Sequence, residues 1–317
     1  MKKEDLRIVF MGTPEFAVET LKALVENQYN VVAVVTQPDK PVGRHGSVLQ
    51  PSAVKQYALE KGLPVLQPEK MKDPAFVETL RGYGANLQVV VAFRMLPEVV
   101  WDMPEYGTFN VHAALLPQYR GAAPINWAII NGETQTGVTT FFLDHDIDTG
   151  RIIMQKSFDI PDDADVEYVY DGLMALGAQI AIETVDALID GNGTIESKPQ
   201  ADTGNLHDAP KLTKSNCKIN WAWDAKQVYD FIRGLSPIPG AWGEVTLPDG
   251  TTMEMKIYKA GKCEKKEVPD GVSEGTLIKE KKHIYIMCND GPLELLKLQP
   301  IGKPKMDAAA FANGLRV

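Results

Sequence analysis

Asn110 and His112 lie two residues apart in the mainly apolar segment T-F-N-V-H, which covers residues 108 to 112. In a β-strand such residues share one face, so an amide and an imidazole would stand side by side. The pair can donate and accept hydrogen bonds, and the imidazole can gain or lose a proton near neutral pH. At the carboxyl end of a parallel strand, where clefts form, the pair indicates a binding or catalytic site. A structural pair with partners in the core would explain the same residues equally well.

A run of carboxylates, D-H-D-I-D-T-G, occupies residues 144 to 150. Acids at alternate positions resemble the start of a calcium-binding loop. That loop needs glycine at its sixth position and an acid at its twelfth, where this chain has Thr149 and Gln155. The sequence therefore argues against calcium and leaves three carboxylates near the end of a strand. For Asp144 and Asp146 a solvated turn remains an equal alternative.

Several common site types are disfavoured. Gly12 follows the first apolar run, but G-T-P-E-F-A lacks the second and third glycines of the dinucleotide-binding fingerprint, and no P-loop motif occurs. The three cysteines, Cys217, Cys263 and Cys288, are odd in number and far apart. They argue against a disulfide framework and a structural zinc site, and they fit a reducing compartment.

The first half of the chain predicts the elements that would position these residues. Apolar runs alternate with helical patterns, which is typical of a parallel sheet covered on both faces. We expect strands at residues 7–11, 31–36, 87–92, 108–112 and 137–142. We expect helices at residues 15–26 and 166–189, and another that follows the loop at 37–51 and ends at residue 61. Residues 37 to 51 read as a polar loop that contains proline and glycine.

A second domain is predicted after residue 206. We expect a first domain over residues 1–190, a linker over 191–206 and a second domain over 207–317. The last part shows a helix near 225–234 and five short strand patterns, near 243–247, 251–258, 275–279, 283–288 and 293–298. Five short strands favour a small barrel of OB type, although a plain β-sandwich would give a similar pattern.

Charge is distributed unevenly between these parts. The net charge is -9, yet residues 207–317 hold 17 Lys and Arg against 14 Asp and Glu. The preceding 206 residues hold 16 against 28. The second domain is therefore the one expected to meet phosphate groups.

The motifs together resemble the methionyl-tRNA formyltransferase family. The likeness covers essentially the whole chain and rests on N-V-H, A-L-L-P-Q-Y-R-G-A-A-P and D-H-D-I-D-T-G at this spacing. The F-M-G-T-P-E-F-A start and the V-T-Q-P-D-K-P-V-G-R loop are also similar to the family. N-x-H and L-L-P are shared with other formyltetrahydrofolate-using transferases, whereas R-G-A-A-P, the loop at 37–51 and the carboxy-terminal extension point to the tRNA enzyme.

The resemblance implies a Rossmann-like formyltransferase domain followed by an OB-like, tRNA-binding domain. It implies transfer of a formyl group from 10-formyltetrahydrofolate to the amine of initiator methionyl-tRNA, without a metal or a covalent intermediate. Asn110 and His112 would stabilise the oxyanion, and Asp148 would orient His112 and favour its charged form. Backbone at Val90, Val91, Ala92 and Phe93 and at Ala114, Leu115, Leu116 and Pro117 would bind the folate. Lys40 and Arg44 would contact the tRNA.

Two departures from the family pattern concern the folate pocket. Ala114 stands where the family usually has serine, and Ala92-Phe93-Arg94 stands where it often has A-Y-G. A small-amine formyltransferase or a non-catalytic RNA-binding protein are the competing hypotheses. The second domain argues against the first, and the presence of Asn110, His112 and Asp148 argues against the second. We also expect a cytoplasmic protein, because no signal sequence begins the chain and no stretch approaches the ~20 apolar residues of a membrane span. We further expect a monomer.

Overall fold

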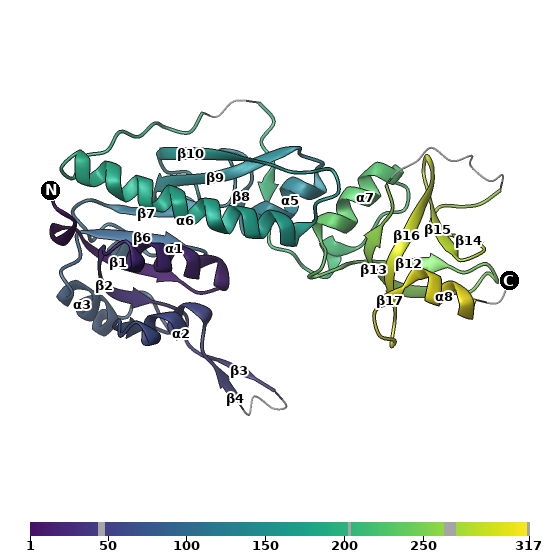
Figure 1. The fold of residues 1–317 in the computed structure, drawn as a ribbon, viewed down its shortest axis with the longest axis horizontal. Coiled ribbons are helices and arrows are strands. Elements are labelled where there is room, and N and C mark those ends of the chain that lie inside the picture. Colours follow the sequence, from purple (N-terminus) through teal and green to yellow (C-terminus); the bar gives the residue numbers. More distant parts are fainter. Residues whose placement is uncertain (44–47, 202–203, 263–270, 316–317) are drawn as a thin grey trace. The chain divides into compact units, whose positions relative to one another are not determined.

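The computed structural model describes residues 1–43, 48–201, 204–262 and 271–315. Contacts divide the chain into two compact units (Figure 1). Unit 1 comprises residues 1–120, 137–158 and 170–207, and unit 2 comprises residues 121–136, 159–169 and 208–317. The boundary at residue 207 lies one residue from the predicted start of the second domain. The predicted linker, residues 191–206, belongs to unit 1. Residues 121–136 and 159–169, predicted to belong to the first domain, are part of unit 2.

A seven-stranded sheet forms the centre of unit 1, in the order β10-β9-β7-β6-β1-β2-β5. Neighbours from β7 to β5 are parallel. The strands are β1 Arg7–Gly12, β2 Asn30–Val35, β5 Val65–Leu66, β6 Leu87–Val91, β7 Thr108–His112, β9 Gln135–Phe142 and β10 Ile152–Asp159. The predicted parallel sheet is confirmed over these five strands.

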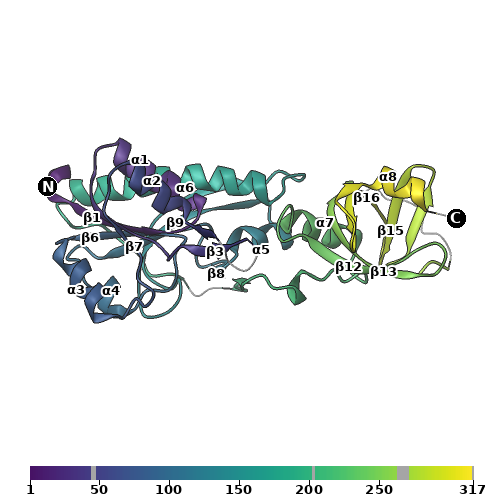
Figure 2. The same ribbon diagram turned by 90° about the horizontal axis from the view of Figure 1, so that it is seen from below.

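Helices cover both faces of this sheet. Figure 2 shows α1 and α6 on one side and α3 and α4 on the other. Alternation along β1 explains the two layers, since Val9 and Met11 join a buried cluster with Phe76 and Leu80 of α3. The helices and short elements are η1 Lys3–Asp5, α1 Glu15–Glu26, α2 Ala53–Glu60, α3 Pro74–Gly82, α4 Glu98–Trp101, α6 Val166–Asp190 and β8 Arg120–Gly121.

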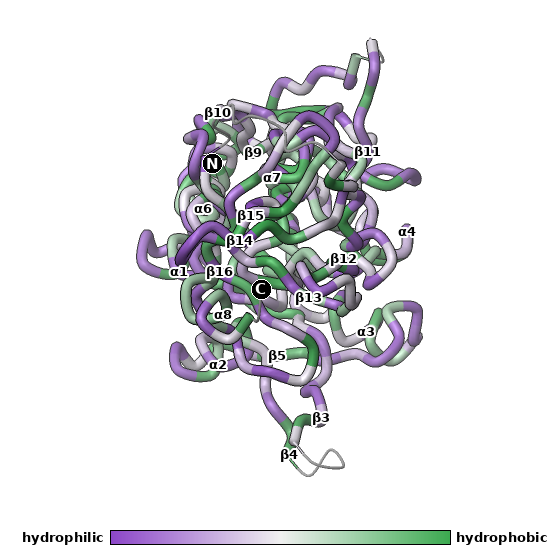
Figure 3. Tube along the Cα trace, turned by 90° about the vertical axis from the view of Figure 1, so that its right-hand side faces the viewer, coloured by the Kyte–Doolittle hydropathy of each residue, from purple (hydrophilic) through white to green (hydrophobic). Residues whose placement is uncertain are grey.

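Three expectations for this half of the chain were wrong. The strand at 137–142, expected as part of the parallel sheet, is β9, and it pairs antiparallel with β7. Residues 37–51, expected to be a loop, contain the antiparallel strands β3 Lys40–Val42 and β4 Val48–Gln50, which project from the rest of unit 1 (Figures 1 and 3). The third is the expectation that no stretch approaches the length of a membrane span. Helix α6 is long and apolar enough to cross a membrane, judged by length and composition alone. It packs on the sheet, where the Thr184 hydroxyl bonds that of Thr140 on β9 at 2.9 Å.

Unit 2 is built on an antiparallel sheet in the order β12-β13-β16-β15-β14, with β17 beside β16. All five predicted strands and the predicted helix are confirmed. The amphipathic helix α7 packs Val228 and Ile232 into the core of this sheet. The elements are α5 Pro124–Ile130, β11 Asp208–Ala209, η3 Ser215–Cys217, α7 Ala225–Gly234, β12 Ala241–Thr246, β13 Thr252–Ala260, β14 Leu277–Glu280, β15 His283–Cys288, β16 Gly291–Pro300, β17 Met306–Asp307 and α8 Ala308–Gly314.

Candidate active site

Strand β7 carries Asn110 and His112 on one face, as the sequence predicts. Its neighbours β6 and β9 are largely buried, so both polar side chains start from within the sheet. The amide oxygen Oδ1 of Asn110 is buried and has no hydrogen-bond partner among the described residues. An unpaired buried amide is costly, so this atom fits a position that a bound substrate completes.

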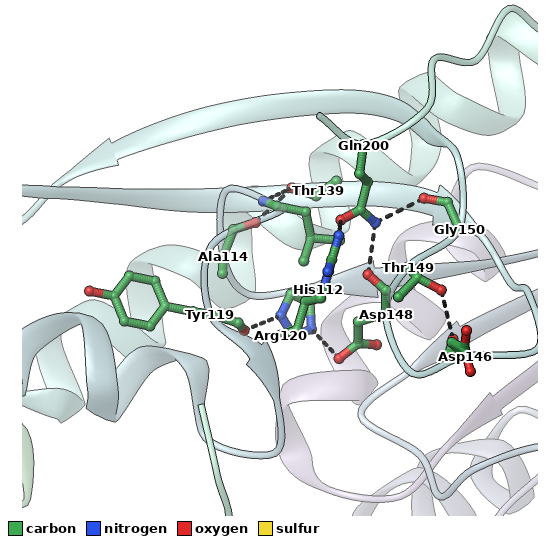
Figure 4. Close-up of polar contacts among 11 residues, drawn as sticks. His112, Ala114, Tyr119, Arg120, Thr139, Asp146, Asp148, Thr149, Gly150 and Gln200 are labelled. Atoms are coloured by element: carbon green, nitrogen blue, oxygen red, sulfur yellow. Dashed lines mark hydrogen bonds and ion pairs between the residues drawn. The ribbon is translucent and has the colours of Figure 1, made fainter. Parts of the chain in front are cut away.

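The His112 ring lies between a carbonyl and a carboxylate (Figure 4). Nε2 donates to the Tyr119 carbonyl oxygen at 2.8 Å, and Nδ1 lies 3.8 Å from Asp148 Oδ2. A carbonyl oxygen only accepts, so Nε2 must carry a proton and Nδ1 is where a second proton can be gained or lost. At 3.8 Å the nitrogen and the carboxylate are not directly hydrogen bonded, although their charges still attract. His112 is thus fixed by a hydrogen bond at Nε2, while its Nδ1 faces the Asp148 carboxylate.

Both residues that face His112 have unusual backbone conformations. Tyr119 has φ 60° and Asp148 has φ 55°, in the left-handed region that residues with a Cβ seldom adopt. Gly150 closes the Asp148 loop against the sheet, because a Cβ there would lie 1.7 Å from the Phe142 carbonyl oxygen. Strained backbone that is held in place by its surroundings is typical of functional sites.

The segment Ala114–Pro117 is anchored by one buried hydroxyl. Thr139 Oγ1 donates to the Ala114 carbonyl at 2.6 Å and accepts from the Leu116 amide at 3.1 Å. Gln155 Nε2 adds bonds to the Leu116 carbonyl at 2.8 Å and to Thr139 at 3.0 Å. Side chains of strands β9 and β10 therefore hold the Ala114–Pro117 backbone, which is one of the two segments expected to contact folate.

A cavity of about 510 Å³ lies beside the Asp148 loop in unit 1. Apolar side chains of the 95–101 segment and charged groups at its rim line it: Lys70, Met71, Lys72, Met95, Leu96, Pro97, Glu98, Trp101 and His145. Its size falls within the range of small-molecule sites, but it is open to solvent at Met95, and neither His112 nor Asp148 lines it. Arg94, which departs from the family pattern, is not among the lining residues and donates to the carbonyls of Pro68 and Glu69. Burial lowers the pKa of the Arg94 guanidinium.

The structure places His112 and Asp148 close together at the carboxyl end of β7, with Asn110 two residues earlier on the same strand. Of the predicted folate-contacting residues, Val90, Val91, Ala114 and Leu116 are buried, while Ala92, Phe93, Leu115 and Pro117 keep accessible surface. Lys40 is exposed on β3. Arg44 lies outside the described residues.

Sequence reasoning missed the residues that support the site. Thr139, Gln155 and Gln200 all contact its backbone, and the cavity-lining residues were not predicted either. For Thr139 a signal existed, because G-V-T-T-F-F places hydroxyls inside an apolar strand, as N-V-H places an amide and an imidazole. Among the described residues, no group of three or more His, Cys, Asp or Glu could hold a metal ion.

Comparison with known proteins assigns the chain to a family. The formyl transferase model matches residues 6–185, and the formyl transferase C-terminal domain model matches residues 211–316. The chain is 58% identical to a methionyl-tRNA formyltransferase of Parabacteroides distasonis, over 100% of this chain and 98% of that protein. It is 55% identical to one of Bacteroides thetaiotaomicron, with the same coverage.

Among solved structures, a similar fold is that of an N-formyltransferase from Helicobacter canadensis in complex with folinic acid and dTDP-3-aminofucose. Its TM-score is 0.65 at 20% identity, covering 93% of this chain and 99% of that one. This likeness concerns the fold alone. The family models and the full-length relatives, together with the geometry around His112, show that the chain belongs to the methionyl-tRNA formyltransferases of the formyl transferase family.

Proposed function

We propose that this protein transfers the formyl group of 10-formyltetrahydrofolate to the α-amine of methionyl-tRNA, which gives N-formylmethionyl-tRNA for translation initiation. The observation that carries the proposal is the His112 ring, held at Nε2 by Tyr119 and facing Asp148 at Nδ1. It lies two residues from Asn110, whose Oδ1 has no hydrogen-bond partner among the described residues. The relatives at 58% and 55% identity, each covered over 98% of its length, are named methionyl-tRNA formyltransferase.

The chemistry follows from the proton positions. When the neutral amine attacks the formyl carbon, the carbonyl oxygen gains negative charge, and a nearby N–H stabilises it. A proton on Nδ1 of His112 supplies such a donor, and the Asp148 carboxylate lies 3.8 Å from that nitrogen. Asn110 supplies the second polar contact from the same strand face. The attacking amine loses a proton, and His112 or an ordered water passes a proton to the folate nitrogen as its bond to the formyl carbon breaks.

The donor site is proposed at the cavity and the Ala114–Pro117 segment. The apolar lining from Met95, Leu96 and Trp101 suits a flat ring system, and Lys70 and Lys72 suit the carboxylates of a folate tail. We also propose that backbone at Val90–Phe93 contributes to this site, as the resemblance implies. No metal or covalent intermediate is needed.

We propose two tRNA-binding parts. The first is the hairpin of β3 and β4, where Lys40 and Arg44 would contact the acceptor end of the tRNA. Val48 and Leu49 are exposed on β4 and would pack against apolar surface of the same tRNA end. The second is the domain at 207–317, the OB-like part of the chain. Two features support an OB-like fold for this domain. The first is the five-strand order β12-β13-β16-β15-β14. The second is an isolated bridge between Thr246 and Thr276, which joins the end of β12 to the segment before β14. We propose that the protein acts as a monomer in the cytoplasm, with domains at 1–190 and 207–317 and the segment 191–206 between them.

Three acceptors, tested side by side, check the proposed reaction: charged initiator methionyl-tRNA, uncharged tRNA and glycinamide ribonucleotide. Only the charged tRNA should be formylated, and His112→Ala and Asn110→Ala should remove most turnover while tRNA binding persists. Formylation of the small amine instead would assign the protein to another branch of the family. Near-normal turnover by either variant would reject the catalytic assignment.

The tRNA-binding proposal has its own test. Lys40→Ala and Arg44→Leu should weaken methionyl-tRNA binding and reduce its steep dependence on salt, because fewer counterions are released. Lys22→Ala, on helix α1, is the matched control and should bind normally. Equal affinities for all four proteins would show that the hairpin does not contact the tRNA.

A further inference from the structure

Gln200 lies in the segment that the sequence predicted as a linker, yet it reaches the Asp148 loop. Lys198 and Ile152 exchange both backbone hydrogen bonds, at 2.8 and 2.9 Å, so this stretch runs along the start of β10. Two residues further on, Gln200 Nε2 donates to the Asp148 carbonyl at 2.7 Å and to the Gly150 carbonyl at 2.9 Å. One side chain thus fastens the backbone on both sides of Thr149 (Figure 4).

Arg120 decides which way the Gln200 amide points. Its Nε and Nη2 donate to Gln200 Oε1 at 3.1 and 2.8 Å. A guanidinium has only donors, so the amide oxygen must face it and the NH₂ group must face the two carbonyls. Both amide hydrogens and both oxygen lone pairs are then used, and the orientation is unique.

These bonds act where the backbone is least favourable. Asp148 has φ 55°, a conformation that a residue with a Cβ keeps only when its surroundings impose it. In that conformation its carboxylate lies 3.8 Å from His112 Nδ1. We propose that Gln200, oriented by Arg120, is a positioning residue that holds Asp148 against His112; the inference rests on the proposed function of that site.

The decisive variant is Gln200→Met, which keeps the side-chain length and removes all four hydrogen bonds. We expect kcat to fall roughly 10- to 100-fold, because a shift of about 1 Å in a catalytic group has that effect. KM for both substrates should stay within about threefold, since the Gln200 amide is fully used by Arg120, Asp148 and Gly150. Ser197→Ala is the matched control: Ser197 lies in the same segment and bonds Arg151 at 2.9 Å, beside Gly150 but away from Asp148. Its kcat should match wild type.

A double-variant cycle separates positioning from general support. If Gln200 acts through Asp148, Gln200→Met should add less than about a twofold loss of kcat to Asp148→Asn. Multiplied losses would overturn the proposal, as would wild-type kcat in Gln200→Met. Should Gln200→Met fail to fold, Gln200→Glu keeps the acceptor for Arg120, removes the donors and must show the same loss.

A second readout does not depend on turnover. The ¹⁵N signals of the His112 imidazole should move in Gln200→Met and stay in Ser197→Ala, because only the first variant frees Asp148. Unmoved signals in Gln200→Met would reject the positioning role. A wild-type protein that makes no N-formylmethionyl-tRNA would reject the proposed function, while these signals would still report on the contact with Asp148.

Discussion

Replacing Thr139 by valine tests whether one buried hydroxyl anchors the segment that is proposed to bind folate. The two side chains have nearly the same shape, so the change removes hydrogen bonds without leaving a cavity. The Ala114 carbonyl and the Leu116 amide, both buried, lose their Thr139 partner. Each unsatisfied buried group costs about 1–3 kcal/mol, so the loss of stability for the two groups should be about 2–6 kcal/mol.

This loss should leave the protein folded at 25 °C, because domains are typically stable by about 5–15 kcal/mol. A calorimetric melt should show the transition of unit 1 lowered by roughly 5–15 °C. Steady-state kinetics at 25 °C should show KM for 10-formyltetrahydrofolate raised about tenfold, the equivalent of about 1.4 kcal/mol. KM for methionyl-tRNA should not change.

Thr140→Val is the matched control. Thr140 is the next residue on β9, equally buried, but its hydroxyl bonds Thr184 of α6 and not the Ala114–Pro117 segment. Thr184 keeps its bond to the Ile180 carbonyl, so this variant should lose only about 0.5–1.5 kcal/mol and keep a normal KM. A wild-type melt and KM for Thr139→Val, or an equal rise of KM in both variants, would refute the anchoring role.

Three further predictions concern other contacts. Gly150→Ala should fail to fold or lose most activity, because its Cβ would lie 1.7 Å from the Phe142 carbonyl oxygen, and expression with circular dichroism checks this. Hydrogen bonds from Lys55 and Gln67 lower the pKa of Asp39, so this contact stabilises the protein above the ordinary carboxyl pKa of 3.8 and is lost as pH falls through the lowered value. Melting temperatures of wild type and Asp39→Asn should therefore differ at pH 6 and converge only once the pH has fallen below the lowered pKa of Asp39. Burial raises the pKa of the Cys217 thiol, so this cysteine should resist alkylation at pH 8 until the protein is unfolded, as a mass-spectrometric time course would show.

The sequence predicted the central strands well because they are buried on both faces and read as continuous apolar runs. It predicted the β7 pair for the complementary reason, since Asn110 and His112 interrupt such a run. The direction of β9 could not be predicted, because an apolar strand reads alike when parallel or antiparallel. Gln200 could not be found either. It is a polar residue in a polar stretch, and its role depends on an approach between segments about 50 and 80 residues apart.

The hairpin shows a different limit. Lys40–Val42 and Val48–Gln50 are three-residue strands with exposed side chains, so they lack the burial pattern by which strands are recognised. Their pairing and the bonds of Asp39 to Lys55 and Gln67 define this part, and no composition rule anticipates those contacts.

The interleaving of the two units has a consequence for folding during synthesis. Helix α5 belongs to unit 2, where Asn126 Nδ2 donates to the Gly234 carbonyl and Gly234 leaves room for Ile130. Its partner helix is made roughly 100 residues later, which at about 5–20 residues per second means a delay of about 5–20 s. During that interval the side of α5 that packs against α7 in the folded protein has no partner and stays exposed. A chaperone that binds exposed apolar helices on the nascent chain would find its target at residues 124–130, and a pause in translation before residue 234 would prolong that exposure.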